Sequence, residues 1–326
     1  RERAVSTRHT NGRWLSALPC SARGALVCRV RQGAVSRSLL RSSCPAPVLT
    51  VRLPGMDSLG TGAVGRPHPA LRPFVNAYVG YRHQGAPAVH HGVAGPSATV
   101  ILAFDEPIDT AWKDDPASRG EHWRLASGLH TRPALIHTGG SQHGIQLDLT
   151  PLGVRALLGL PVGALARALV SHDDVPLGLT TQAHEAIADA TTWPQRFALL
   201  DTALLASVTS GGERRTAAAP SAALEGWHLL NASAGRMSIC ALAASTGWSV
   251  RHVHTCFVAE FGVTPKQVAQ LMRFERARAL VARGGSLARV AAESGYADQA
   301  HLTREWTRFA GQPPRATLAE LAEFAV

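Results

Sequence analysis

The stretch SICALAASTGWSVRHVHTCFVAEFGVTP, residues 238–265, is followed by a second version of itself, SLARVAAESGYADQAHLTREWTRFAGQPP, residues 286–314. The offset is 48 residues at the opening serines (286 − 238) and 49 at the closing prolines (314 − 265), so the second copy carries one inserted residue. The matched positions are apolar, glycine, aromatic or proline: Ile239 with Leu287, Leu242 with Val290, Ala243 with Ala291, Gly247 with Gly295, Trp248 with Tyr296, Val253 with Leu302, Phe257 with Trp306, Gly262 with Gly311 and Pro265 with Pro314. A repeat of this kind indicates the organisation of a fold before any single motif does.

Each copy predicts two helices joined by a short turn. Apolar residues recur at helical spacing after a serine that can cap the first helix. A glycine, which tolerates a positive φ, then ends that helix. A second capping residue, Ser249 or Asp298, opens a longer helix in which Phe257 or Trp306 is expected to be a buried contact between the helices. Two helices around a short glycine turn are typical of a helix-turn-helix.

The region resembles the tandem helix-turn-helix domain of AraC-family transcription regulators over residues 222–319. The resemblance includes the segment between the motifs, PKQVAQLMRFERARALV, in which Pro265 suits the first turn of a helix. It also includes the run GYADQAHLTREWTRFAG of the second copy. The resemblance implies that the second helix of each motif is a recognition helix that enters the major groove of double-stranded DNA.

Outward-facing positions of the expected recognition helices, 249–261 and 298–310, are the candidate DNA contacts. They are Arg251, His254 and Thr255 in the first helix and Gln299, His301, Thr303 and Arg304 in the second. Family members commonly carry arginine at the position of Thr255, which matches Arg304. Arginine can form two hydrogen bonds with guanine and threonine cannot, so the first motif is expected to read its half-site more weakly. The alternative is that Arg251 and Arg304 contact only phosphates, which fixes position without reading sequence.

The net charge of +10 does not by itself indicate DNA binding, because it is unevenly spread. Residues 1–55 hold ten arginines and one acid (+9), residues 56–219 hold 12 basic and 14 acidic groups (−2), and residues 220–326 hold 11 and 8 (+3). The Arg- and Ser-rich first segment can be interpreted as a disordered basic arm, as a transit peptide or as translated sequence upstream of a start at Met56, and we favour the last. No apolar run in the chain approaches the roughly 20 residues of a membrane helix.

Residues 67–150 predict a β-rich region. Short strands separated by Gly and Pro indicate a barrel or a sandwich. Strands are expected at Val75–Arg82, at Ser97–Phe104, in RPALIHTGG (132–140) and in HGIQLDLTPLG (143–153). The last of these alternates Ile145, Leu147 and Leu149 on one face. The segment DEPIDTAWKDDPASRGEH (105–122) is rich in turn-forming residues and is expected to be a loop.

From Gly153 onward the pattern becomes helical, in GVRALLGL, in PVGALARALV and in two longer stretches after Thr180. In the last stretch Phe197, Leu200, Leu204 and Val208 share one helical face, which suits packing onto the strands or pairing with a second subunit. The segments HHGVAGPSATVILAF and LTPLGVRALLGLPVGALA resemble the sensory domain found in some AraC-like regulators. The polar, small-residue segment GGERRTAAAPSA indicates a domain boundary.

The residues that could bind a metal ion, line a pocket or catalyse a reaction are better explained as surface or core residues. Seven histidines lie between residues 83 and 143, but His90 and His91 are neighbours that would point to opposite faces of a strand, and no H-x-H pair accompanies a carboxylate. Core packing is favoured over a pocket for Trp112 and Trp123. Cys240 and Cys256 lack the CxxC spacing of a zinc site and are expected to be inert. No catalytic, metal or cofactor site is therefore expected.

The sequence thus predicts an α+β chain: a leader at 1–55, a barrel-like β-rich sensory domain with a helical C-terminal part at 56–210, a linker at 211–221, and an all-α domain of two helix-turn-helix motifs with a linking helix at 222–326. The expected function is cytoplasmic, sequence-specific, DNA-binding transcription regulation. A small-molecule effector, RNA polymerase and a second copy of the chain are candidate partners. The alternative is a small-molecule-binding β-domain enzyme with a helical protein-interaction module. Polar, basic outer faces on the recognition helices would favour DNA, and continuous apolar faces would favour a protein partner.

Overall fold

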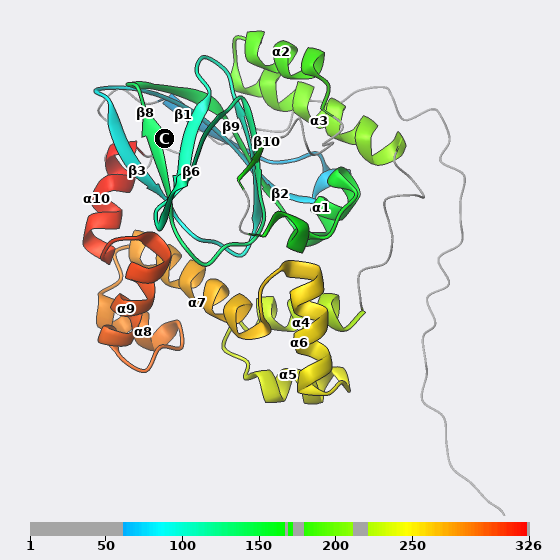
Figure 1. The fold of residues 1–326 in the computed structure, drawn as a ribbon, viewed down its shortest axis with the longest axis vertical. Helices are drawn as coiled ribbons and strands as arrows, with labels where there is room; N and C mark the ends of the chain where they lie inside the picture. The colour runs from blue at the N-terminus through cyan, green and yellow to red at the C-terminus, as the bar shows by residue number, and fades with distance from the viewer. Residues whose placement is uncertain (1–60, 167–168, 172–178, 211–220, 325–326) are drawn as a thin grey trace, which may run out of the picture. The chain divides into compact units, whose positions relative to one another are not determined.

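The computed structural model describes residues 61–166, 169–171, 179–210 and 221–324 (Figure 1). These residues all belong to one compact unit of the chain. The expected leader at 1–55 lies outside the described residues. So does the expected linker, except for Ser221, which is the first residue of a helix.

Two antiparallel sheets make up the N-terminal part of the described chain. One sheet has six strands in the order β1-β2-β9-β4-β7-β10, and the other has four in the order β3-β8-β5-β6. The strands are β1 (Thr61–Gly65), β2 (Val75–Gln84), β3 (Ala88–Gly92), β4 (Ala98–Ala103), β5 (Ile108–Trp112), β6 (Asp115–His122), β7 (Arg124–Ser127), β8 (Ala134–Thr138), β9 (Ser141–Leu149) and β10 (Val170–Ser171). The expectation of a β-rich region followed by helices is confirmed, and the strands form two separate sheets that do not close into one barrel.

All four expected strands are present, as β2, β4, β8 and β9. The alternation expected in β9 is also confirmed, because Ile145, Leu147 and Leu149 are all fully buried. The loop expected at 105–122 is wrong, since this segment forms the hairpin of β5 and β6. Strand β6 lies at the edge of its sheet and exposes most of its side chains, so it tolerates a polar sequence that would be unsuitable in a central strand.

Helices cover the six-stranded sheet. The helical elements of this part are η1 (Pro69–Leu71), α1 (Pro151–Leu158), η2 (Val162–Leu165), α2 (Thr181–Asp189) and α3 (Trp193–Ser210). Helix α3 buries Phe197, Leu200 and Leu204 and partly buries Val208, as their shared face predicted. It packs beside β1, which was one of the two expected alternatives (Figure 1). The helix expected in PVGALARALV (161–170) is wrong in its extent, because the described residues of this segment form a short 3-10 turn, η2, directly after Pro161.

The C-terminal part consists of seven helices among the residues from 221 to 324. They are α4 (Ser221–Ala232), α5 (Ile239–Thr246), α6 (Val250–Phe261), α7 (Pro265–Ala282), α8 (Leu287–Glu293), α9 (Gln299–Ala310) and α10 (Pro314–Phe324). Helices α5 and α6 form the first expected motif, α8 and α9 the second, and α7 links them (Figure 1). Phe257 and Trp306 are both fully buried, as expected.

Burial lowers the pKa of several histidines in the β-rich part, and it lowers that of His90 in β3 to about 4. The same cause lowers the pKa values of His122, His130 and His143. An unfolded histidine titrates near 6.5. Between about pH 4 and 6.5 the unfolded chain therefore binds protons that the folded chain does not bind, so acid in this range favours unfolding.

We expect the free energy of unfolding to be greatest above pH 6.5 and to fall progressively as the pH falls toward 4. His90 alone should account for about 2 kcal/mol of the loss between pH 7 and pH 5. Urea denaturation at the two pH values measures the loss, and His90→Asn should show a smaller one. An identical loss in wild type and His90→Asn would contradict a neutral, half-buried His90.

Candidate nucleic-acid interface

Side-chain caps fix where the two candidate recognition helices begin. In the first motif Gly247 ends α5 with a φ of 72°, and the Ser249 side chain accepts a hydrogen bond from the His252 backbone N–H at 3.2 Å. In the second motif Gly295 has a φ of 78°, and the Asp298 carboxylate accepts from the His301 N–H at 2.6 Å. A left-handed glycine followed by an N-cap turns the chain sharply and starts the next helix at a defined residue. Helices α6 and α9 therefore begin where the sequence predicted.

The outer face of α6 holds three of the candidate contacts. Arg251, His254 and Thr255 are all exposed. The Thr255 hydroxyl donates a hydrogen bond to the Arg251 carbonyl oxygen at 3.1 Å, which occupies its proton within the helix. Val250 and Val258 are also exposed, by 45% and 42%. This face therefore combines polar and apolar side chains, and Arg251 is the one permanently charged residue among its three candidate contacts.

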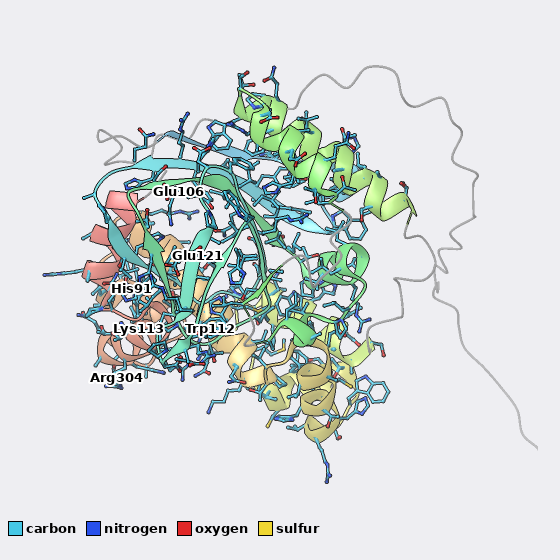
Figure 2. The ribbon with its side chains drawn as sticks, turned by 45° about the horizontal axis from the view of Figure 1, so that its top comes forward. His91, Glu106, Trp112, Lys113, Glu121 and Arg304 are labelled. Atoms are coloured by element: carbon cyan, nitrogen blue, oxygen red, sulfur yellow. The ribbon has the colours of Figure 1, made fainter. Side chains whose placement is uncertain are left out.

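The outer face of α9 is more polar. Gln299 and Arg304 are exposed. Arg304, which is labelled in Figure 2, makes no ion pair within the described residues. Thr303 is partly exposed, and its hydroxyl donates to the Gln299 carbonyl oxygen at 2.9 Å. His301 is held close to its own motif, because its ring meets the Tyr296 ring edge-on at 5.2 Å and its Nδ1 lies 3.4 Å from the Ala297 backbone N. Of the four candidates on α9, Gln299 and Arg304 are the most accessible.

Two accessible side chains on α9 were not among the sequence candidates. Thr307 and Arg308 are exposed and lie three and four residues after Arg304, so they share its face. Their helical spacing from Arg304 could have identified them. With these residues the outer face of α9 is polar and basic. A face of this kind favours DNA, whereas a continuous apolar face would favour a protein partner.

A pair of positions matched by the repeat differs in the structure. Trp248 is 42% exposed, whereas its counterpart Tyr296 is 5% exposed. The Trp248 ring stacks on His252, with centroids 4.5 Å apart. A large aromatic side chain therefore lies on the surface just before α6, although the matching residue of the second motif is buried.

A buried carboxylate fixes α9 against the linking helix. Glu305 is 6% exposed and accepts a hydrogen bond from the Gln270 amide at 2.8 Å. The Arg273 guanidinium lies 3.7 Å from its other oxygen. Both partners belong to α7, so the orientation of the second motif relative to α7 depends on this polar contact as well as on apolar packing.

Other candidate groups lie away from these helices. Trp112 is buried as expected, but core packing is wrong for Trp123, which is 50% exposed just before β7. Cys256 is buried and Cys240 is exposed, and neither forms a disulfide. The described residues include no group of three or more His, Cys, Asp or Glu placed to hold a metal ion. None of the helices in the described ranges has the length and apolar character needed to cross a membrane.

Comparisons with known proteins found one family model and several solved structures that are similar to parts of this chain. Residues 242–320 match the family model of a helix-turn-helix domain. No curated protein matches the chain. Among solved structures, ToxT from Vibrio cholerae O395 is similar at 9% identity with a TM-score of 0.45, covering 78% of this chain and 100% of that chain. Fatty-acid-bound ToxT from Vibrio cholerae strain SCE256 gives 10% identity, a TM-score of 0.46 and coverages of 76% and 96%. The AraC-like transcriptional activator CuxR gives 13% identity, a TM-score of 0.22 and coverages of 69% and 90%.

Proposed function

We propose that this chain is a DNA-binding transcription regulator with an AraC-type helix-turn-helix domain at its C-terminus. In this proposal α6 and α9 enter successive major-groove segments on one face of double-stranded DNA. Two helices that bind in this way must lie about one helical turn apart, roughly 34 Å. The observation that carries the proposal is the exposed, basic face of α9 around Arg304.

The two recognition helices are proposed to contribute unequally. Arg304 can form two hydrogen bonds with guanine, while the matching Thr255 bonds back to its own helix. Arg251 and His254 are the remaining polar groups on the first helix, and a histidine donates from both ring nitrogens only when it is protonated. We therefore assign most of the sequence discrimination to α9, with Gln299, Thr303 and His301 around Arg304.

Selection of duplexes from a random pool tests the proposal directly. The full chain should enrich a sequence with two recognisable half-sites, and the half-site with the stronger preference should be the one that α9 reads. Enrichment of no sequence at all would contradict sequence-specific binding. Enrichment of a single half-site would contradict the use of both helices.

Arg304→Ala should relax the preference at one base position by about 1–3 kcal/mol, because a bidentate contact to one base edge is lost. Affinities for a panel of single-base operator variants measure this. Arg289→Ala is the matched control, since Arg289 is an exposed arginine on α8 that pairs with Glu293 at 2.5 Å. If Arg304→Ala weakens all duplexes by the same factor, Arg304 contacts phosphate and does not read a base.

The β-rich part, within the expected boundaries 56–210, is proposed to be the regulatory domain, with 211–221 as linker and 222–326 as the DNA-binding domain. A cleft of about 770 Å³ supports a small-molecule effector, because it is lined both by loops of the β-rich part and by α9. Its lining includes Lys113, Arg132 and Arg308.

A second copy of the chain and RNA polymerase are further partners in this proposal. The proposed compartment is the cytoplasm, where these partners and DNA meet. Thermal-shift screening of metabolites on the full chain tests the effector, and sedimentation tests the dimer.

A further inference from the structure

We propose that the β-rich part is a brace that fixes the orientation of α6 relative to α9, and that Arg155 and Lys113 are its positioning residues. This inference rests on the proposed function, because it concerns how two recognition helices keep the spacing that DNA demands. It follows from two separate contacts between the β-rich part and the helix-turn-helix motifs, one to each motif.

The first contact is an ion pair between α1 and α6. The Arg155 guanidinium donates from Nε to Glu260 Oε1 at 2.7 Å and from Nη2 to Glu260 Oε2 at 2.5 Å. Glu260 is 1% exposed, and its hydrogen bonds raise the pKa of Arg155. Paired donors and acceptors of this kind fix direction as well as distance. The ion pair therefore holds the last turn of α6 in one orientation against α1.

A close approach between the backbones of η2 and the end of α6 adds to this contact. A Cβ atom on Gly163 of η2 would lie 2.7 Å from the backbone nitrogen of Gly262, the residue that ends α6 with a φ of 69°. Such an approach is open only to glycine. The apolar side chains around it, Val162 and Leu165 on one side and Phe261 and Val263 on the other, belong to one continuous buried cluster. The first motif thus shares its core with the β-rich part.

The second contact joins the β-rich part to the end of α9 and to α10. Lys113 donates from Nζ to the Gly311 carbonyl oxygen at 2.5 Å and lies 3.1 Å from His91 Nε2. His91 Nδ1 lies 3.1 Å from the Glu320 carboxylate. The Ala94 backbone N–H donates to the Phe309 carbonyl oxygen at 3.0 Å. Figure 2 shows His91 and Lys113 together where the strands meet these helices.

Both contacts leave the DNA-facing surfaces open. They use the C-terminal ends of the recognition helices, at Glu260 in α6, at Phe309 in the last turn of α9 and at Gly311 just after it. Arg251 and Arg304, on the outer faces, remain exposed. The contacts can therefore persist while DNA is bound, which supports a brace over a contact that blocks binding.

The motifs need such a brace because they do not share one core. The buried cluster of the second motif, which includes Phe274, Trp306 and Phe309, is separate from that of the first. Helix α7 is the covalent connection between them. A single helix with contacts at each end still permits bending and small rotations, whereas a second connection through a packed β-rich part restricts both. We therefore expect the brace to govern the preferred spacing of the half-sites more than the affinity for either half-site.

Half-site spacing provides the test, with the full chain and the operator that it selects from random duplexes. Inserting or deleting one base pair between the half-sites shifts one of them by about 3.4 Å and rotates it by roughly 34°. Wild type should bind the original spacing at least about 30-fold more tightly than either altered spacing, because a misplaced helix loses base contacts worth roughly 5- to 150-fold each. Lys113→Ala and Arg155→Ala should each reduce this ratio by about fivefold or more. Lys113→Arg and Arg155→Lys should retain more of it than the alanine variants.

Arg119→Ala is the matched control, because Arg119 also forms an ion pair, with Asp109 at 2.6 Å, but within the β5–β6 hairpin. It should leave the spacing ratio unchanged. If Arg155→Ala does not fold, the spacing ratio of Lys113→Ala is by itself the test of the brace. A spacing ratio equal to wild type in Lys113→Ala would overturn the brace, including the case in which every duplex binds more weakly because Lys113 had contacted phosphate. Selection of no operator by wild type would instead defeat the proposed function, and the brace with it.

Discussion

Trp306→Ala should lower the free energy of unfolding of the described C-terminal helices by about 3–5 kcal/mol, the usual loss when a fully buried large aromatic side chain is truncated. Trp306 is fully buried in the second motif and meets the Phe274 ring edge-on at 5.2 Å. Its indole N–H donates to the Thr317 hydroxyl at 2.9 Å. The substitution therefore leaves a cavity between α7 and α9 and removes one hydrogen bond to the buried Thr317 hydroxyl in α10, which also donates to the Pro313 carbonyl oxygen.

Urea denaturation of the full chain measures this loss. Trp123→Ala is the matched control, because Trp123 is 50% exposed and its truncation should change the free energy of unfolding by only about 0.5 kcal/mol. Trp306→Phe should lie between the two, since it keeps an aromatic ring but loses the hydrogen bond to Thr317. Equal stability of Trp306→Ala and wild type would show that the second motif does not pack around this residue.

The second large effect is expected at the ion pair between Arg155 and Glu260. Arg155→Ala should reduce the free energy of unfolding by about 3–5 kcal/mol, because it leaves the Glu260 carboxylate buried without its counter-charge. The double substitution Arg155→Met with Glu260→Met should cost less, since replacing both charges by apolar groups removes the uncompensated carboxylate. The single substitution measures the cost of leaving Glu260 buried without a partner. The double substitution measures how much the intact ion pair contributes relative to apolar side chains in its place.

The same denaturation assay tests this order of stabilities. Arg119→Ala breaks an ion pair whose arginine side chain is 56% exposed, and solvent screening should make its effect much smaller. A double variant as unstable as Arg155→Ala would mean that packing at this place matters more than charge. An Arg155→Ala variant as stable as Arg119→Ala would show that Glu260 reaches solvent when Arg155 is absent.

The sequence was sufficient to predict the features that depend on neighbouring residues. The repeat, the caps Ser249 and Asp298 and the helical spacing around Phe257 and Trp306 define the two motifs, because helix formation depends on contacts within a few residues. The alternation of β9 was equally predictable, since a strand with one buried face shows its period in the sequence.

Pairing between distant residues could be determined only from the tertiary structure. The polar segment at β6 is a strand because β5 lies beside it, and Trp248 is exposed although Tyr296 at the matching position is buried. The ion pair of Arg155 and Glu260 joins residues 105 positions apart, and the contact of His91 and Glu320 joins residues 229 apart. Periodicity reports only which face of an element is buried, and it carries no information about which other element covers that face. For this reason the two contacts between the motifs and the β-rich part could not be predicted from the sequence.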